Sequence, residues 1–312
     1  MKSVRVFAPA SVANFGVGFD ALGAALDGPG DVVTARLVSR PGVRVVSITG
    51  DGGRLPRDAR RNTAAVAAAA VLEEHGRRGA GLELALAKGL PLSSGLGSSA
   101  ASAAAGARAA GLLLGVRGKS ALLGAVLRAE HAADGSWHGD NAFASLFGGM
   151  LLVPSSDPNR LVPPVALRTP KTLRLVLVHP ALELTTRRSR SVLPKTVTMA
   201  SHVEHAAALA GLVASLAAGD LRAAGRFVSS DRLVETARAP LVPGHAAVTA
   251  AMLAAGAFGC ALAGGGPALM ALSAAGPDPL RIARAAVRAW RSEGVAATAR
   301  VHRLDGRGAR RA

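Results

Sequence analysis

"PLSSGLGSSAAS", residues 91–102, is the stretch on which the fold assignment depends. It follows the strand-like "LELALA" (82–87) and precedes a long alanine-rich run that predicts a helix. Gly95 and Gly97 would let backbone N–H groups approach a ligand closely. The stretch alone is compatible with two structures. One is a simple turn with Ser98 as the helix N-cap, and the other is an anion site at the helix N-terminus.

Two familiar nucleotide fingerprints are incomplete here. Gly95, Gly97 and Ala100 form G-x-G-x-x-A, but a Rossmann fold carries this pattern in its first βα unit, with an acidic residue about 20 positions later. The corresponding region, "GVRGKSAL" (115–122), contains no acidic residue. The same segment contains G-K-S, yet Leu113 stands where a Walker A motif has its first glycine. Neither fingerprint therefore explains the stretch.

The chain is strongly basic, with a formal net charge of +17 over 312 residues. Nucleic-acid binding is one explanation of such a charge. The arginines are scattered, however, and the one local cluster, "RGARRA" (307–312), is typical of a frayed terminus. A nucleic-acid role is thus an unfavoured alternative, and a small anionic substrate fits the charge equally well. The single cysteine, Cys260, excludes a disulfide framework and a cysteine-based zinc site.

A cytoplasmic location without a membrane span is expected. Residues 246–277 carry no charge over more than the ~20 residues that a span requires. They are mostly alanine and glycine, and "GGGP" interrupts them, so a helix followed by two short strands is the better prediction. The opening "MKSVRVFAPAS" has no apolar region typical of a signal peptide.

Strand and helix patterns alternate irregularly, which predicts an α+β fold in both halves of the chain. Strands are expected at 4–9, 31–38, 43–48, 82–87, 148–153, 173–180, on both sides of "GGGP" and at 295–302; helices are expected at 61–76, from 98 to about 115, from an N-cap at Ser120 to about 133, and near 199–218, 219–229, 245–257 and 278–293. Residues 154–171 contain five prolines and suggest a boundary between domains at 1–160 and 161–312.

Three motifs in one order resemble those of the GHMP small-molecule kinases. Residues 91–102 resemble their phosphate-binding motif, "APASVANFGVGFDALGAAL" (8–26) their N-terminal substrate motif, and "ALAGGGPALMAL" (261–272) their C-terminal glycine motif. "GSWHGDNAFASLFGGM" (135–150) is similar to the H-x-D-N segment of the homoserine kinases within that family. The resemblance implies an N-terminal two-layer α/β domain, a ferredoxin-like C-terminal domain and an active site in the cleft between them.

The resemblance also implies an ATP site with Mg²⁺. Ser98 and Glu130 would hold the metal, a hard cation that prefers oxygen ligands, and Asn62 would lie near the adenine. The phosphates would lie over residues 91–101, which are Pro91, Leu92, Ser93, Ser94, Gly95, Leu96, Gly97, Ser98, Ser99, Ala100 and Ala101.

For the acceptor, the resemblance implies L-homoserine, which has an ammonium, a carboxylate and a primary hydroxyl. Asp20 would bind the ammonium and Asn14 would orient the hydroxyl. Arg190 and Arg238 would hold the carboxylate, for which a guanidinium is well shaped; Arg187 and Arg188 leave the register of the first arginine open. The implied substrate-binding residues are Asn14, Asp20, His138, Asp140, Arg190 and Arg238.

Asn141 stands near the place where several GHMP kinases have an aspartate base. The implied mechanism is direct attack on the γ-phosphate without a dedicated base, and the implied catalytic residues are Asn14, Glu130, Asn141 and Arg238. Gly265 and Ala268 replace residues that commonly carry hydroxyl groups in the third motif. Mevalonate, a sugar or threonine as the acceptor are alternatives, and a homodimer is possible because family members are often dimers.

Overall fold

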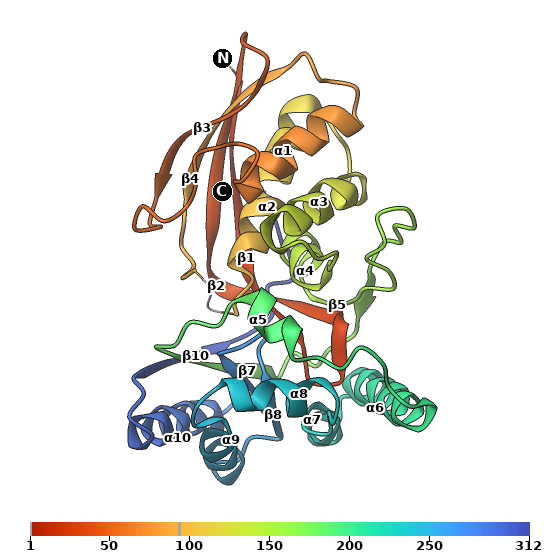
Figure 1. Ribbon diagram of the computed structural model, residues 1–312, viewed down its shortest axis with the longest axis vertical. Helices are drawn as coiled ribbons and strands as arrows, with labels where there is room; N and C mark the ends of the chain where they lie inside the picture. Colours follow the sequence, from red (N-terminus) through yellow and green to blue (C-terminus); the bar gives the residue numbers. More distant parts are fainter. Residues whose placement is uncertain (1, 93–94) are drawn as a thin grey trace.

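The computed structural model of this chain describes residues 2–92 and 95–312. Two lobes lie one above the other along the longest axis of the molecule, and each combines a β-sheet with helices (Figure 1). The two-domain α+β fold expected from the motifs is confirmed. The division at residues 160 and 161 stays a proposal.

The upper lobe is built on a seven-stranded sheet with the order β11-β1-β2-β4-β3, to which β5 and β6 are added through β2. Its strands are β1 (Ser3–Asn14), β2 (Gly18–Val38), β3 (Gly42–Thr49), β4 (Gly81–Ala87), β5 (Met150–Leu152), β6 (Val165–Leu167) and β11 (Arg310–Arg311). β3 and β4 are parallel, whereas the other neighbours are antiparallel. β2 is much longer than the expected strand at 31–38, because its first half pairs with the end of β1 and with β5.

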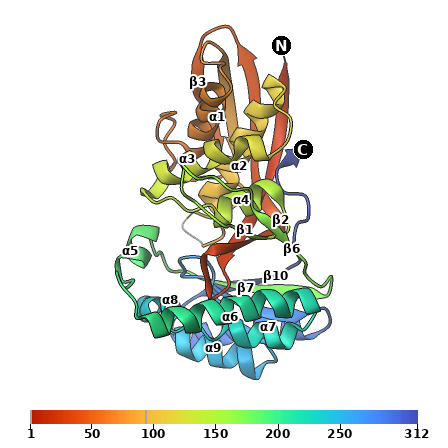
Figure 2. The same ribbon diagram turned by 90° about the vertical axis from the view of Figure 1, so that its right-hand side faces the viewer.

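Four helices cover one face of this sheet: α1 (Thr63–Glu74), α2 (Ser98–Leu114), α3 (Leu123–Asp134) and α4 (Asp140–Phe147) (Figures 1 and 2). α2 lies in the middle, with 12 of its residues buried, and small side chains allow this close packing. At Gly106, for example, a Cβ atom would lie 2.2 Å from the carbonyl oxygen of Ala64 on α1. The alanine-rich composition therefore allows α2 to lie deep in the lobe.

The lower lobe has an antiparallel sheet with the order β10-β7-β9-β8, and helices pack below it (Figure 2). Its strands are β7 (Leu173–Pro180), β8 (Gly259–Leu262), β9 (Leu269–Ala274) and β10 (Ala297–His302). Its helices are α5 (Thr186–Ser191), α6 (Met199–Ala218), α7 (Leu221–Val228), α8 (Val234–Arg238), α9 (His245–Ala254) and α10 (Asp278–Ser292). A short 3₁₀ turn follows α8 at Ala239–Leu241, and another precedes α3 of the upper lobe at Ser120–Leu122. Trp290 is fully buried at its core.

Two local expectations are wrong. The C-terminal cluster is an ordered strand: Arg310 and Phe7 are paired residues of β11 and β1, and the guanidinium of Arg310 lies 2.9 Å from Asp305 and over the Phe7 ring. Ser120 does not cap the following helix, because it begins a 3₁₀ turn and the N-cap of α3 is Leu122.

The uncharged segment at 246–277 forms all of α9 except His245, the strands β8 and β9 and the turn between them, as expected. Within residues 2–92 and 95–312, no helix has both the length and the apolar character needed to cross a membrane.

Candidate active site

A cleft of about 800 Å³ lies between the lobes, and its wall contains residues from all four sequence motifs. The predicted site residues that line it are Asn14, Asp20, Asn62, Leu92, Gly95, Gly97, Ser98, Ser99, Glu130, His138, Asp140, Asn141, Arg190 and Arg238. Ala100 and Ala101 are buried behind it in α2. Ser93 and Ser94 lie outside the described residues. One cleft thus brings together side chains that are more than 200 positions apart in the sequence.

The start of α2 faces this cleft without a side-chain cap among the described residues. Its N-cap is Gly97, in the left-handed region at φ 62°, and not Ser98. A Cβ atom on Gly97 would lie 2.1 Å from the Ser11 hydroxyl, so only glycine fits. The first backbone N–H groups of a helix carry partial positive charge and need partners. An anion in the cleft would provide them, which favours the phosphate site over the capped turn.

Glu130 and Ser98 offer oxygen atoms that lack partners. Glu130 Oε1 and Ser98 Oγ are buried, and neither has a hydrogen-bond partner in the described part of the chain. Burial raises the pKa of Glu130 to about 7, although the His138 charge and the Ser99 hydroxyl oppose the rise. A carboxylate and a hydroxyl suit Mg²⁺, which usually keeps water and substrate oxygens among its ligands. The residues present therefore fit a magnesium ion bound together with phosphate oxygens. No group of three or more His, Cys, Asp or Glu residues in the described ranges forms a site for an all-protein metal centre.

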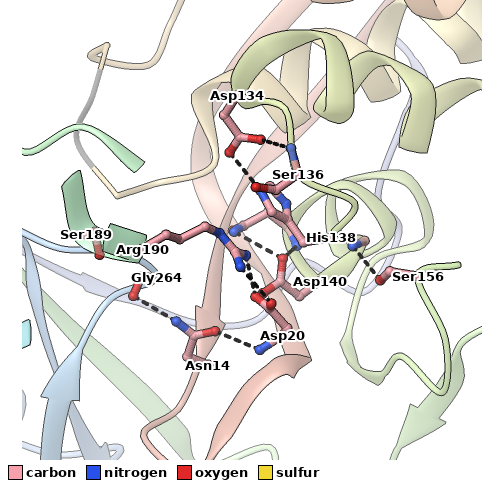
Figure 3. Close-up of polar contacts among 12 residues, drawn as sticks. Asn14, Asp20, Asp134, Ser136, His138, Asp140, Ser156, Ser189, Arg190 and Gly264 are labelled. Atoms are coloured by element: carbon pink, nitrogen blue, oxygen red, sulfur yellow. Dashed lines mark hydrogen bonds and ion pairs between the residues drawn. The ribbon is translucent and has the colours of Figure 1, made fainter. Parts of the chain in front are cut away.

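His138 is surrounded by carboxylates. Its Nε2 lies 2.8 Å from Asp134 Oδ2 (Figure 3). Its Nδ1 lies 3.9 Å from Glu130 Oε2. Burial alone would lower the pKa of His138, but the hydrogen bond to Asp134 and the charges of Asp140 and Glu130 raise it to about 9. The imidazole is therefore a cation at neutral pH and cannot serve as a proton acceptor there.

Asp140 and Asn141 begin α4 beneath the phosphate loop. The Asn141 side-chain oxygen accepts a hydrogen bond of 3.0 Å from the Ser11 hydroxyl, and both groups lie against Gly97. Burial, followed by the charge of Asp20, raises the pKa of Asp140 to about 6. Asn141 thus lies between the loop and the acceptor side of the cleft.

Asn14 and Arg238 meet at the third motif. The Asn14 amide nitrogen donates to the Gly264 carbonyl at 2.8 Å, and Arg238 Nη1 donates to the same oxygen at 3.2 Å. Arg238 also donates from Nε to the Ser189 carbonyl at 3.1 Å, and it is almost completely buried. Burial and the Arg190 charge lower its pKa to about 10, so it remains a cation. The Asn14–Gly264 bond joins the two lobes on the side of the cleft where the acceptor is expected.

Asp20 and Arg190, predicted to bind opposite charges of one substrate, are bonded to each other here. The distances are 3.0 Å from Nη1 to Oδ2 and 2.7 Å from Nη2 to Oδ1 (Figure 3). Asp20 has a left-handed backbone at φ 55°, and its N–H donates to the Asn14 side chain. The ring of Phe19 lies near the guanidinium groups of both Arg190 and Arg238.

Comparisons with known proteins agree with this geometry. The family described as GHMP kinases N terminal domain matches residues 62–149, and the family described as GHMP kinases C terminal matches residues 212–296. A homoserine kinase from Chlorobium phaeobacteroides (strain BS1) is 40% identical over 296 residues, or 91% of each chain. One from Arabidopsis thaliana is 43% identical over 315 residues, covering 99% of this chain and 84% of the relative.

The chain belongs to the homoserine kinase family. The crystal structure of homoserine kinase from Cytophaga hutchinsonii shares 40% identity and a TM-score of 0.93, covering 100% of this chain and 98% of that one. Galactokinase from Lactococcus lactis, at 17% identity and a TM-score of 0.69, shares the fold alone. Membership of this kinase family makes the chain an enzyme of a group that uses ATP.

Motif comparison missed a buried network behind the phosphate loop of this homoserine kinase family member. Lys88 follows β4 and pairs with Asp31 of β2, and its ammonium donates to the Ser98 carbonyl at 2.8 Å and to Ser102 Oγ at 2.9 Å. Ser102 donates in turn to Asp31 at 2.6 Å. A buried lysine is unusual unless it is paired. The network ties the first turn of α2 to the sheet.

Asn62 has both ends of its side chain engaged. The oxygen accepts from the Ala65 N–H at 3.4 Å and caps α1, while the nitrogen donates to the Pro56 carbonyl at 3.1 Å. It lines the cleft, but these bonds also give it a structural role in the wall. Its predicted place near the adenine stays a proposal.

The two departures from the homoserine kinase pattern lie in different surroundings. Ala268 is fully buried between β8 and β9 and does not line the cleft. Gly265 lines the cleft, and a Cβ atom there would lie 3.2 Å from the Ser189 hydroxyl. That hydroxyl is buried and has no partner among the described residues. A hydroxyl from α5 thus lies beside the position where the third motif lacks one.

Proposed function

We propose that this chain phosphorylates the hydroxyl of L-homoserine with ATP, giving O-phospho-L-homoserine and ADP in threonine biosynthesis. One observation supports this most strongly. The cleft combines an uncapped helix start beside glycine turns with an Asp20, Arg190 and Arg238 set that matches an ammonium and a carboxylate. The names of the relatives agree with that acceptor.

We assign the nucleotide phosphates to residues 91–101 and the adenine to the neighbourhood of Asn62. Ser98 and Glu130 would hold Mg²⁺, since Ser98 Oγ and Glu130 Oε1 have no hydrogen-bond partner among the described residues. The metal would neutralise phosphate charge when bound. The N–H groups at the start of α2 act in the same sense, because they point positive dipole ends at the phosphates.

For the acceptor, Asp20 takes the ammonium, while Arg190 and Arg238 take the carboxylate. Asn14 orients the hydroxyl from a side chain that Gly264 and the Asp20 N–H hold in place. His138 and Asp140 complete the polar wall around the substrate, with His138 as a cation. Correct placement of the two reactants is a large part of catalysis in such a transfer.

In the transfer, the homoserine hydroxyl oxygen bonds to the γ-phosphorus while the bridging bond to the β-phosphate oxygen breaks. The hydroxyl proton leaves late, to the transferred phosphoryl group or to water, because the Asn141 amide cannot accept it. Loose phosphoryl-transfer transition states need little assistance from a base. Asn141 and Ser11 then serve to shape the loop.

We expect Glu130→Ala to reduce kcat/KM by on the order of 10³-fold, because it removes a metal ligand from the transferring phosphoryl group. Arg238→Ala should be similarly harmful, since it removes a buried carboxylate-binding group. Asn141→Ala should retain more activity than either. Steady-state kinetics of the three variants test the mechanism, and the largest loss of kcat/KM in Asn141→Ala would contradict it. Glu204→Ala, on the exposed face of α6, is the control.

The acceptor is tested by a coupled ADP-release assay with homoserine, threonine, mevalonate and galactose. The proposal expects homoserine to be turned over best. Equal or better turnover of mevalonate or galactose would replace it with another GHMP kinase activity. Steeply salt-dependent DNA binding with no ATP-dependent turnover would replace it with the nucleic-acid alternative. A cytoplasmic location and a homodimer remain part of the proposal.

A further inference from the structure

The acceptor end of the cleft contains an ion pair between the two groups that must hold opposite ends of the substrate. Asp20 and Arg190 form two parallel hydrogen bonds, and 32% and 26% of their side-chain surfaces are exposed. Both residues line the cleft. A ligand that uses either group must therefore first separate it from the other.

The surroundings indicate which partner moves. Asp20 lies near the start of β2, where its N–H donates a hydrogen bond to the Asn14 side chain. Arg238, next to it, is held by two carbonyl oxygens. Arg190, in contrast, lies on the six-residue helix α5, in which Ser189 is the buried residue. The Arg190 side chain can thus turn away while Asp20 and Arg238 stay in place.

The cost of separating this pair depends on whether the ligand carries an ammonium, a carboxylate or both. A ligand with an ammonium alone would pair with Asp20 and leave the Arg190 guanidinium without its partner. A ligand with a carboxylate alone would pair with Arg190 and leave Asp20 unpaired. A zwitterion pairs with both groups at once, so no charge in the cleft loses its partner. Leaving one member of this partly exposed ion pair unmatched carries a modest cost, of about five-fold in binding.

We propose that the Asp20–Arg190 pair is a specificity filter that opens for zwitterionic alcohols and rejects alcohols carrying a single charge. This rests on the proposed function, because it explains how an amino-acid acceptor is selected. Specificity of this kind comes from a penalty on wrong ligands as well as from contacts with the right one. The partial exposure of the pair keeps the exchange feasible, because an ion pair in contact with water is weak.

The test uses L-homoserine and two analogues that each lack one charge. 4-Hydroxybutanoate lacks the ammonium, and 3-amino-1-propanol lacks the carboxylate. Dissociation constants are measured by calorimetry in the presence of a non-hydrolysable ATP analogue. Wild-type protein should bind homoserine much more tightly than either analogue. Each difference should exceed what the direct contact of the one missing charge contributes.

The decisive variants should improve binding of one analogue each. Asp20→Asn frees Arg190, so it should bind 4-hydroxybutanoate about five-fold more tightly than wild type while it binds homoserine more weakly. Arg190→Gln frees Asp20 and should bind 3-amino-1-propanol about five-fold more tightly. Arg188→Gln removes the same charge from an exposed position on the same helix and should leave all three constants unchanged.

Both gains together support the filter, and the absence of either gain in a folded variant overturns it. General damage to the site would weaken every ligand, so it cannot imitate a gain. If wild-type protein neither binds nor phosphorylates homoserine, the proposed function fails. If it does both and the gains are missing, the filter alone fails.

Discussion

Two ion pairs in the cleft wall differ in almost every physical respect. Lys88 and Asp31 have 1% and 0% of their side chains exposed and lie within the upper lobe. Arg190 and Asp20 have 26% and 32% exposed, and they connect α5 of the lower lobe with the start of β2. The comparison indicates that the proposed phosphate half of the site is held by a buried pair, whereas the proposed acceptor half is held by a partly exposed pair, as the proposed filter requires.

The difference follows from what each half must bind. Every nucleotide phosphate brings the same negative charge, so a permanently placed helix start suits it. The proposed acceptor would bring two opposite charges, and the groups assigned to receive them, Asp20 and Arg190, are bonded to each other. A buried pair would be too stable to open for this purpose, because removing one partner from a buried pair costs about 3–5 kcal/mol.

The largest expected effect is on the buried pair. Lys88→Met should lower the free energy of unfolding by about 3–5 kcal/mol, because it leaves the Asp31 carboxylate buried without its cation. It also removes the donor to the Ser98 carbonyl at the start of α2. Urea denaturation measures the loss of stability, and kinetics of the folded fraction should show a higher KM for ATP with little change for homoserine.

The double variant Asp31→Asn/Lys88→Met tests the cause. It removes both charges, so most of the stability should return while the KM for ATP stays high. Lys171→Met, at an exposed position before β7, is the matched control and should change neither quantity. If Lys88→Met were as stable as Lys171→Met, the Lys88–Asp31 pair would contribute no more to stability than a surface ion pair.

The same comparison explains what the sequence could reveal. Gly95, Gly97 and Ser98 lie in one continuous stretch, so their chemistry can be predicted from local spacing. Lys88 directly follows the predicted strand at 82–87 and comes just before the stretch at 91–102, so its position was a local signal. Its partner Asp31 depends on how β2 pairs with β4, which no local pattern reveals.

The acceptor half was predictable only through motifs of a known family. Those motifs named Asp20 and Arg190 but not their contact, because α5 was not predicted and the contact depends on how the lobes meet. Phe19, which contacts Arg190, was missed for the same reason. Asp134 is four residues before His138, and their contact depends on the turn at Gly135 that ends α3. The ordered C-terminal strand was missed because Arg310 has its partners in Phe7 and Asp305, of which Phe7 is distant in sequence.

A smaller effect is expected on the pH dependence of acceptor binding. Burial and the Asp20 charge raise the pKa of Asp140 to about 6, so its negative charge is lost as the pH falls through 6. Homoserine, with its ammonium nearby, should bind up to about 10-fold more weakly at pH 5 than at pH 7. Titration calorimetry across this range should show the loss of homoserine affinity at low pH in wild type and in the control variant Asp157→Asn. The affinity of Asp140→Asn should depend less on pH.

Stability should change with pH in the opposite sense. The folded pKa of Asp140 is above its ordinary value of 3.8, so the folded chain binds the proton more tightly than the unfolded chain. The contribution of this group to stability is therefore full below about pH 4 and is lost as the pH rises through 6. Asp140→Asn should remove that decline, and an unchanged decline would assign it to another group.

The smallest expected effect is on the exposed pair. Asp20→Asn should change the free energy of unfolding by less than about 1 kcal/mol, because Arg190 regains water when it loses its partner. Urea denaturation measures the change in the free energy of unfolding in both Asp20→Asn and Lys88→Met. The ratio of these two changes is the most direct test of the difference between the two ion pairs. A loss of several kcal/mol in Asp20→Asn would show that the pair holds the lobes together. An ion pair of that strength could not be exchanged for a substrate, and the acceptor half would then be as rigid as the phosphate half.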